Sequence, residues 1–184
     1  MASDAELITR SLDGDGNAFV EVICRHEVAL GAYLARRVGR DRAEDLLGDV
    51  WVAAYESRRN YDKSFANARP WLYGVALNML RRHWRSQPAE DLVPDVTSMA
   101  SGWDPWPAVD ARVDTQTLLR AALAKLQPTQ REVLTLVAWE DLTAAEAARV
   151  LVIPAGTARR LLHQARKELR NAPEVVALLK IPTV

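Results

Sequence analysis

The segment LTAAEAARVLVIPAGTARRLLHQARKELR, residues 142–170, decides the fold of the C-terminal part of the chain. Thr143, followed three residues later by Glu146, forms a Thr-x-x-Glu capping box that starts a short helix. Further on, Pro154 presets the backbone of the first turn of a longer helix. A short helix, a tight turn and a longer basic helix in these proportions indicate a helix-turn-helix.

The longer helix of this segment, expected from Pro154 to Arg170, has two chemically different faces. Apolar residues at helical spacing predict a buried stripe made of Ala158, Leu161, Leu162, Ala165 and Leu169. The opposite face carries small, polar and basic residues: Gly156, Thr157, Arg159, Arg160, His163, Gln164 and Lys167. Such a face suits the major groove of DNA, because arginines reach phosphates and base edges there. The alternative, a basic face that is merely solvated, is disfavoured because the capping box, the turn and the buried stripe all agree with a helix-turn-helix.

The rest of the chain also shows helical rather than strand periodicity. Before the linker we expect four helices, at Ala5 to Leu12, at Phe19 to Val38, near Arg42 to Arg59, and after Pro70. After the linker we expect about four, near Thr115 to Leu126, Pro128 to Trp139, Thr143 to Leu151 and Pro154 to Arg170. No convincing alternating strand is present. The expected fold class is therefore all-α, with two small helical domains.

An irregular acidic linker separates the two helical blocks. Between residues 87 and 112 there are four prolines and five acidic residues, but only one base, Arg112. Trp103 and Trp106 lie in this stretch, and we expect part of it to dock on a partner surface. The expected organisation is a first domain over 1–86, the linker over 87–112, a second domain over 113–171 and a tail over 172–184.

A second segment with chemical character runs from Lys63 to Ala89, which contains no acidic residue. Basic and aromatic residues are interleaved along it: Lys63, Phe65, Arg69, Trp71, Tyr73, Arg81, Arg82, Trp84 and Arg85. Arginines can follow a phosphate backbone while aromatic rings hold an unstacked base, so the segment predicts binding of unpaired DNA. The alternative, in which the aromatic residues belong to the core and the arginines are solvated, stays open, above all for Trp71.

Composition excludes several other classes of protein. The 24 basic and 24 acidic residues cancel, which excludes coating of nucleic acid through bulk charge but permits a local basic face. The single cysteine, Cys24, excludes an internal disulfide and is expected to be a buried thiol. In the turn DGDGN, Ala18 and Cys24 occupy positions where a calcium loop needs glycine and glutamate. We therefore expect a helix-capping turn there and no metal.

Enzymatic chemistry and membrane insertion are not indicated either. The chain has no glycine-rich phosphate loop, no metal-spaced Cys/His set and no recognisable Ser/His/Asp arrangement. We therefore expect a protein that is not an enzyme and needs no cofactor. The start of the sequence lacks a basic and apolar leader, and no stretch of about 18 apolar residues occurs. A cytoplasmic protein without membrane insertion is the expectation.

Three segments, in order around the linker, resemble the extracytoplasmic-function (ECF) group of bacterial sigma factors. AEDLLGDVWVAAY, from Ala43 to Tyr55, is similar to the family's polymerase-binding helix, and ARPWLYGVALNMLRRHWR, from Ala68 to Arg85, resembles its helix for melting and reading the minus-ten element. Residues 123–169 resemble region four, which reads the minus-thirty-five element. The resemblance covers nearly the whole chain and implies a subunit that directs RNA polymerase to promoters.

The resemblance also implies partners and site residues. Core RNA polymerase would be bound through the clamp coiled coil of the β′ subunit, facing Asp45, Leu46, Asp49 and Val50, and through the β flap. Minus-ten DNA would be contacted by Asn78, Arg81 and Arg82, with a flipped base held by the loop from Asn60 to Asn67. The full minus-ten set is Lys63, Phe65, Arg69, Trp71, Asn78, Arg81, Arg82 and Arg85, and the minus-thirty-five set is Gly156, Thr157, Arg159, Arg160, His163 and Lys167. Promoter DNA and an anti-sigma protein complete the implied partners.

The sequence departs from the family pattern at four places. Gly48 replaces the usual glutamine, and a glycine inside a helix costs about 1 kcal/mol relative to alanine. Val152 replaces the glycine of the helix-turn-helix, so we expect the turn to differ in shape. Ala147 and Ala158 replace larger aliphatic residues, which predicts a tighter or weaker core around them.

Two other interpretations compete with this one. A plain helix-turn-helix regulator would explain residues 128–169 almost as well, but it leaves the first half of the chain unexplained. A sigma-like scaffold that no longer starts transcription is suggested by Gly48 and Val152. The apolar tail could cap a domain or bind a partner.

Overall fold

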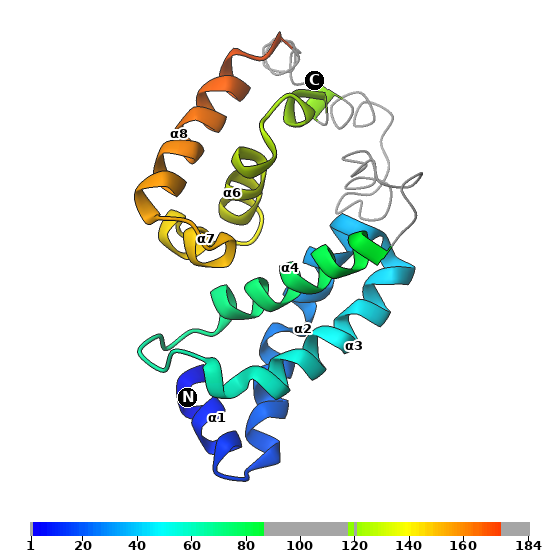
Figure 1. Cartoon of the computed structure of the whole chain (residues 1–184), viewed down its shortest axis with the longest axis vertical. Helices are drawn as coiled ribbons and strands as arrows, with labels where there is room; N and C mark the ends of the chain where they lie inside the picture. Colours follow the sequence, from blue (N-terminus) through cyan, green and yellow to red (C-terminus); the bar gives the residue numbers. More distant parts are fainter. Residues whose placement is uncertain (1, 87–117, 120, 174–184) are drawn as a thin grey trace, which may run out of the picture. The chain divides into compact units, whose positions relative to one another are not determined.

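The computed structural model describes residues 2–86, 118–119 and 121–173, and these are helices joined by turns and loops, with no β-strand among them (Figure 1). The chain divides into two compact units, Met1–Asp95 and Val96–Val184. The expected linker lies outside the described residues, as does the tail beyond Pro173. None of the described helices is long and apolar enough to cross a membrane.

The first unit contains the helices α1 (Asp4–Leu12), α2 (Gly16–Val38), α3 (Arg40–Ser57) and α4 (Arg69–Ser86), with a 3-10 turn η1 (Arg58–Asn60) after α3. Helix α1 starts in a capping box between Ser3 and Glu6. Helix α2 begins at Gly16 rather than Phe19 because the Asp15 side chain accepts from the Ala18 amide. The expected capping function of the DGDGN turn is thereby confirmed.

The core of the first unit forms where α2 packs against α1, α3 and α4. Tyr33 of α2 and Tyr73 of α4 meet edge to face, with ring centroids 4.9 Å apart, and both are fully buried. Val50 of α3 and Leu72 of α4 complete the same core. The prediction of a buried thiol is wrong: Cys24 is exposed, because the buried face of α2 passes through Val22 and His26 on either side of it.

The second unit is built from α6 (Pro128–Ala138), α7 (Ala144–Leu151) and α8 (Ala155–Asn171), which pack against one another. A helical segment at residues 118–119 and 121–124 precedes them. The predicted capping box of Thr143 and Glu146 is present at the start of α7. Pro154 stands at the N-cap of α8 rather than inside the helix. Ala147 and Ala158 are both fully buried, so their small side chains lie in the core around α8.

Candidate nucleic-acid interface

Helix α8 exposes one polar stripe and buries the other side. Ala158, Leu162 and Ala165 are buried, while Leu161 and Leu169 of the predicted apolar stripe are half-buried. The predicted DNA-facing set lies on the opposite side: Gly156, Arg159, Arg160, His163 and Lys167 are exposed and Thr157 is half-buried. Because the first turn of α8 contains no acidic residue, the helix N-terminus keeps its positive end uncompensated by carboxylates. This surface can accept phosphates.

The turn before α8 keeps a left-handed backbone despite its valine. Val152 has φ 56° and ψ 48°, and its side chain is 86% exposed. Its amide donates to the carbonyl of Arg149, and the Ile153 amide donates to that of Ala148 at 2.9 Å, so the end of α7 is capped. The backbone at this position is thus the left-handed one that a glycine adopts without cost. The helix ending and its capping bonds impose the conformation, at a cost of about 1 to 3 kcal/mol for a β-branched residue.

Helix α4 carries a second basic stripe. Asn78, Arg81, Arg82 and Arg85 follow one another at spacings of three, one and three residues, and all four are exposed. On the other side of the helix, Leu72, Ala76 and Leu80 are fully buried in the core of the first unit. The fold therefore gathers these four predicted minus-ten residues on one surface.

The other predicted minus-ten residues lie at or just before the start of α4, around a loop over residues 61–68 that we call the 61–68 loop. Lys63 is exposed, and the Phe65 side chain is 39% exposed. The ring of Trp71 lies against Tyr61, with centroids 5.3 Å apart, and both Trp71 and Arg69 are half-buried. Trp71 therefore supports the base of the loop by packing. Tyr73 is buried, which agrees with the alternative that aromatic residues of this segment belong to the core.

Internal hydrogen bonds shape the 61–68 loop. The Tyr61 hydroxyl donates to the carbonyl of Phe65. The Ser64 amide donates to Asp62 Oδ1 at 3.0 Å, and the Arg69 amide donates to Asn67 Oδ1 at 2.9 Å. With its backbone held in this way, the loop presents Lys63 and Phe65 outward.

A buried carboxylate outside the predicted site residues ties α1 to this loop. Asp4 Oδ2 accepts from His26 Nε2 at 2.7 Å and from the Ala68 amide at 2.9 Å, and Oδ1 accepts from Arg25 Nη1 at 3.0 Å. The Asp4 amide donates to the carbonyl of Ala66 at 3.0 Å. This group could not be predicted from the sequence, because the partners lie 21 to 64 residues from Asp4 and follow no motif.

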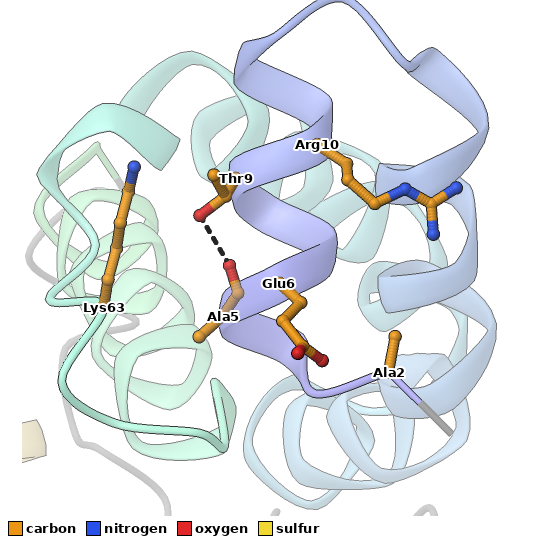
Figure 2. Close-up of a pocket in the computed structure, with 6 residues that line it drawn as sticks. All are labelled: Ala2, Ala5, Glu6, Thr9, Arg10 and Lys63. Carbon is orange, nitrogen blue, oxygen red and sulfur yellow. Dashed lines mark hydrogen bonds between the residues drawn. The ribbon is translucent and has the colours of Figure 1, made fainter.

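The charge of Asp4 is favoured by its partners. Burial by itself would raise the pKa of this carboxyl, but the hydrogen bonds from His26, the Ala68 amide and Arg25 outweigh burial and lower the pKa from 3.8 to about 2. Beside this contact an open hollow separates α1 from the loop, and Lys63 lies across it from Thr9 and Ala5 (Figure 2).

The acidic side of the first unit is on α3. Asp41, Asp45 and Asp49, four residues apart, are all exposed. Leu46 and Val50, which were expected to face a partner beside them, are 7% and 0% exposed. Both residues pack α3 against the core, and Leu46 also lines the hollow between α3 and α4. Their part in a polymerase contact stays a prediction. Gly48 is also exposed, and a side chain added there would meet open space.

A hollow between α3 and α4 brings the acidic and basic surfaces together. Asp49, Val52 and Glu56 line it from α3, and Met79, Arg82 and His83 line it from α4. The hollow therefore offers apolar, acidic and basic groups side by side. Among the described residues no group of three or more His, Cys, Asp or Glu side chains is placed to hold a metal ion.

Comparisons with known proteins agree with the two units. Residues 23–90 match the family described as Sigma-70 region 2, and residues 116–169 match Sigma-70, region 4. The ECF RNA polymerase sigma factor SigF of Caulobacter vibrioides is 32% identical over 167 residues, with 89% of each chain covered. CarQ, an RNA polymerase sigma factor of Myxococcus xanthus, is 31% identical over 167 residues, covering 88% of this chain and 92% of its own.

A solved structure shares the fold over nearly the whole chain. CnrH, in complex with the cytosolic domain of CnrY, is 25% identical, with a TM-score of 0.65 and coverage of 98% of this chain and 99% of its own. The match extends across both units, which the plain helix-turn-helix interpretation did not explain. The chain belongs to the ECF RNA polymerase sigma factors.

Proposed function

We propose that the chain binds core RNA polymerase through the acidic face of α3 and reads promoter DNA with α4, the 61–68 loop and α8. The family gives the general activity, which is promoter-directed initiation of transcription. The assignment of contacts to residues is our proposal, as are the domain boundaries at 1–86, 87–112, 113–171 and 172–184 and a cytoplasmic location.

One observation carries the division of labour within the first unit. The exposed stripe of Asn78, Arg81, Arg82 and Arg85 on α4 offers an amide for base edges and three cations for phosphates. The stripe of Asp41, Asp45 and Asp49 on α3 has the opposite sign and would repel DNA. Separate faces of opposite charge are what a protein needs to engage a polyanion and a protein partner at once.

The polymerase contact assigned here is the β′ clamp coiled coil for α3 and the β flap for the second unit. Because Val50 is fully buried and Leu46 is 7% exposed, the direct contacts on α3 fall mainly to Asp45 and Asp49, and Leu46 adds apolar lining to the hollow beside Asp49. An anti-sigma protein would compete with polymerase by binding the hollow between α3 and α4, whose lining contains apolar, acidic and basic side chains. The relative CnrH, solved in complex with the cytosolic domain of CnrY, supports looking for such a partner.

Charge reversal tests the polymerase surface. Asp45→Arg with Asp49→Arg should abolish capture of core polymerase while leaving the helical circular dichroism unchanged, because both side chains are exposed and no core contact is lost. The matched control is Asp13→Arg, at an exposed carboxylate after α1. Undiminished capture by the folded double variant would show that polymerase binds elsewhere.

A further inference from the structure

The contact between Asp4 and the 61–68 loop joins parts of the chain that are far apart in sequence. Its carboxylate accepts the amide of Ala68, 64 residues away, and its own amide donates to the carbonyl of Ala66. These two bonds lie on either side of Asn67, just before α4 begins. The backbone at the end of the loop is thereby fixed to the first turn of α1.

The carboxylate is itself held in place from α2. His26 Nε2 donates to the same oxygen that accepts from Ala68, and Arg25 donates to the other oxygen and to the carbonyl of Ala2 at 2.7 Å. Asp4 and His26 are 5% and 8% exposed, and Ala68 is fully buried. Water therefore competes little for these bonds, and a buried charged acceptor held by several donors has a defined position.

Helix α1 does not need Asp4 in order to form or to dock. Its start is secured by the capping box of Ser3 and Glu6, and Leu7 and Ile8 are fully buried against the rest of the unit. An apolar or smaller side chain at position 4 would leave that docking in place. The additional effect of the Asp4 side chain is to fix the loop backbone at Ala68.

We propose that Asp4, held by His26 and Arg25, is a positioning residue that sets the conformation of the 61–68 loop and thereby the base selectivity at the minus-ten element. The inference rests on the proposed role of this loop in holding a base. Asp4 acts at a distance from the DNA: it fixes the backbone on either side of Asn67, while Phe65 and Lys63 occupy the exposed part of the same loop.

A measurement of base selectivity distinguishes a positioning role of Asp4 from a merely structural one. Promoter templates are first selected from a randomised library with the wild-type holoenzyme, and single-base changes are then made across the minus-ten element. Run-off transcription gives the ratio between the selected and the changed base. A variant that only lowers the amount of folded protein reduces both transcripts equally and leaves this ratio unchanged, whereas a displaced loop lowers the ratio.

The variants are chosen in pairs. Asp4→Ala removes the acceptor, and Asp4→Asn keeps the size of the side chain but removes the charge, which guards against a failure to fold. His26→Leu removes the donor, and His26→Gln keeps an N–H group. Glu6→Ala is the matched control, because it removes the capping box from the same turn of α1, and the hydrogen bonds of Glu6 go to Ser3 and not to the loop backbone. Phe65→Ala reports whether the loop reads a base at all.

The expected result is that Asp4→Ala and His26→Leu lower the selectivity ratio at one minus-ten position by about fivefold or more, as for a lost base contact. Glu6→Ala keeps the wild-type ratio, and His26→Gln retains most of it. An unchanged ratio in both Asp4 variants, with Phe65→Ala lowering it, overturns the positioning role alone. An unchanged ratio in Phe65→Ala as well overturns the proposed function of the loop, and the positioning role with it.

Discussion

At the scale of single residues, two unusual features matter most: the buried charge of Asp4 and the strained backbone of Val152. Asp4 is ionised inside the first unit because donors from α2 and the 61–68 loop surround it. Val152 adopts a left-handed conformation that glycine adopts without cost. The partners of Asp4 keep a charge that burial alone would disfavour, and the turn holds Val152 in a conformation that a valine seldom adopts. Both effects can be tested through stability.

The first residue-scale prediction concerns pH. Since folding lowers the pKa of Asp4 from 3.8 to about 2, the carboxylate stabilises the folded state above pH 3.8, and this contribution is lost as the pH falls through 2. Asp4→Asn should therefore lower the free energy of unfolding by about 2 kcal/mol near neutral pH, with a smaller difference at lower pH. Chemical denaturation at a series of pH values measures this difference.

The control for that series is Asp13→Asn, at the exposed carboxylate that follows α1. It should cost little stability at any pH. A wild-type advantage over Asp4→Asn that stayed constant from neutral pH down to pH 2 would mean that the charge of Asp4 contributes nothing, and that only its shape matters.

The second residue-scale prediction concerns the turn before α8. Val152→Gly should raise the free energy of unfolding of the second unit by about 1 kcal/mol, because glycine relieves the strain at φ 56° and the exposed valine side chain makes little contact that could be lost. Val152→Ala should stabilise less. Thermal unfolding of the full chain measures both, and a destabilised glycine variant would show that the valine side chain contributes contacts after all.

At the scale of elements, sequence periodicity predicted the helices well, since capping boxes and buried stripes are local features. The start of α7 and the two faces of α8 followed directly from the spacing of Thr143, Glu146 and the apolar residues. The exposed state of Cys24 did not follow, because burial depends on which neighbour covers a helix face. The Asp4 contact, across 64 residues, lies beyond any local pattern.

Helix α8 carries the prediction for upstream DNA. Arg159→Ala with Arg160→Ala should weaken holoenzyme binding to the minus-thirty-five element, each lost contact costing about 1 to 3 kcal/mol and reducing the salt dependence of binding. Arg170→Ala, near the other end of the same helix, is the matched control and should bind like wild type. Equal binding by the double variant at moderate salt would place upstream recognition on another surface.

Helix α4 carries the prediction for DNA opening. Asn78→Ala with Arg81→Ala should reduce permanganate-detected melting and run-off transcript, because one side chain can bond a base edge and the other a phosphate. Arg82 is left intact, since it lines the hollow with Asp49 and its loss would disturb the polymerase surface.

A template already mismatched across the minus-ten region should restore part of the transcript lost by this α4 variant, because its opening cost has been removed. Normal melting on duplex DNA, or a defect that follows weaker polymerase capture, would assign opening to other residues.

At the scale of the whole molecule, the neutral sum of charges hides surfaces of opposite sign. The 24 basic and 24 acidic residues cancel, yet α4 and α8 are basic on their exposed stripes while α3 is acidic. Bulk attraction to DNA is therefore weak, and specific binding depends on local stripes that act together. A protein built in this way is expected to need core polymerase for promoter binding, whereas a plain helix-turn-helix regulator would not.

The most direct measurement is run-off transcription on a linear duplex that carries the promoter of its own gene, with core polymerase alone, with the chain alone and with both. Gel shifts of the same duplex run in parallel. We predict a discrete transcript and a stable promoter complex only when core polymerase and the chain are present together, and loss of both with the Asp45→Arg, Asp49→Arg variant. A stable, specific complex formed by the chain without core polymerase, and no transcript when core is added, would contradict this prediction.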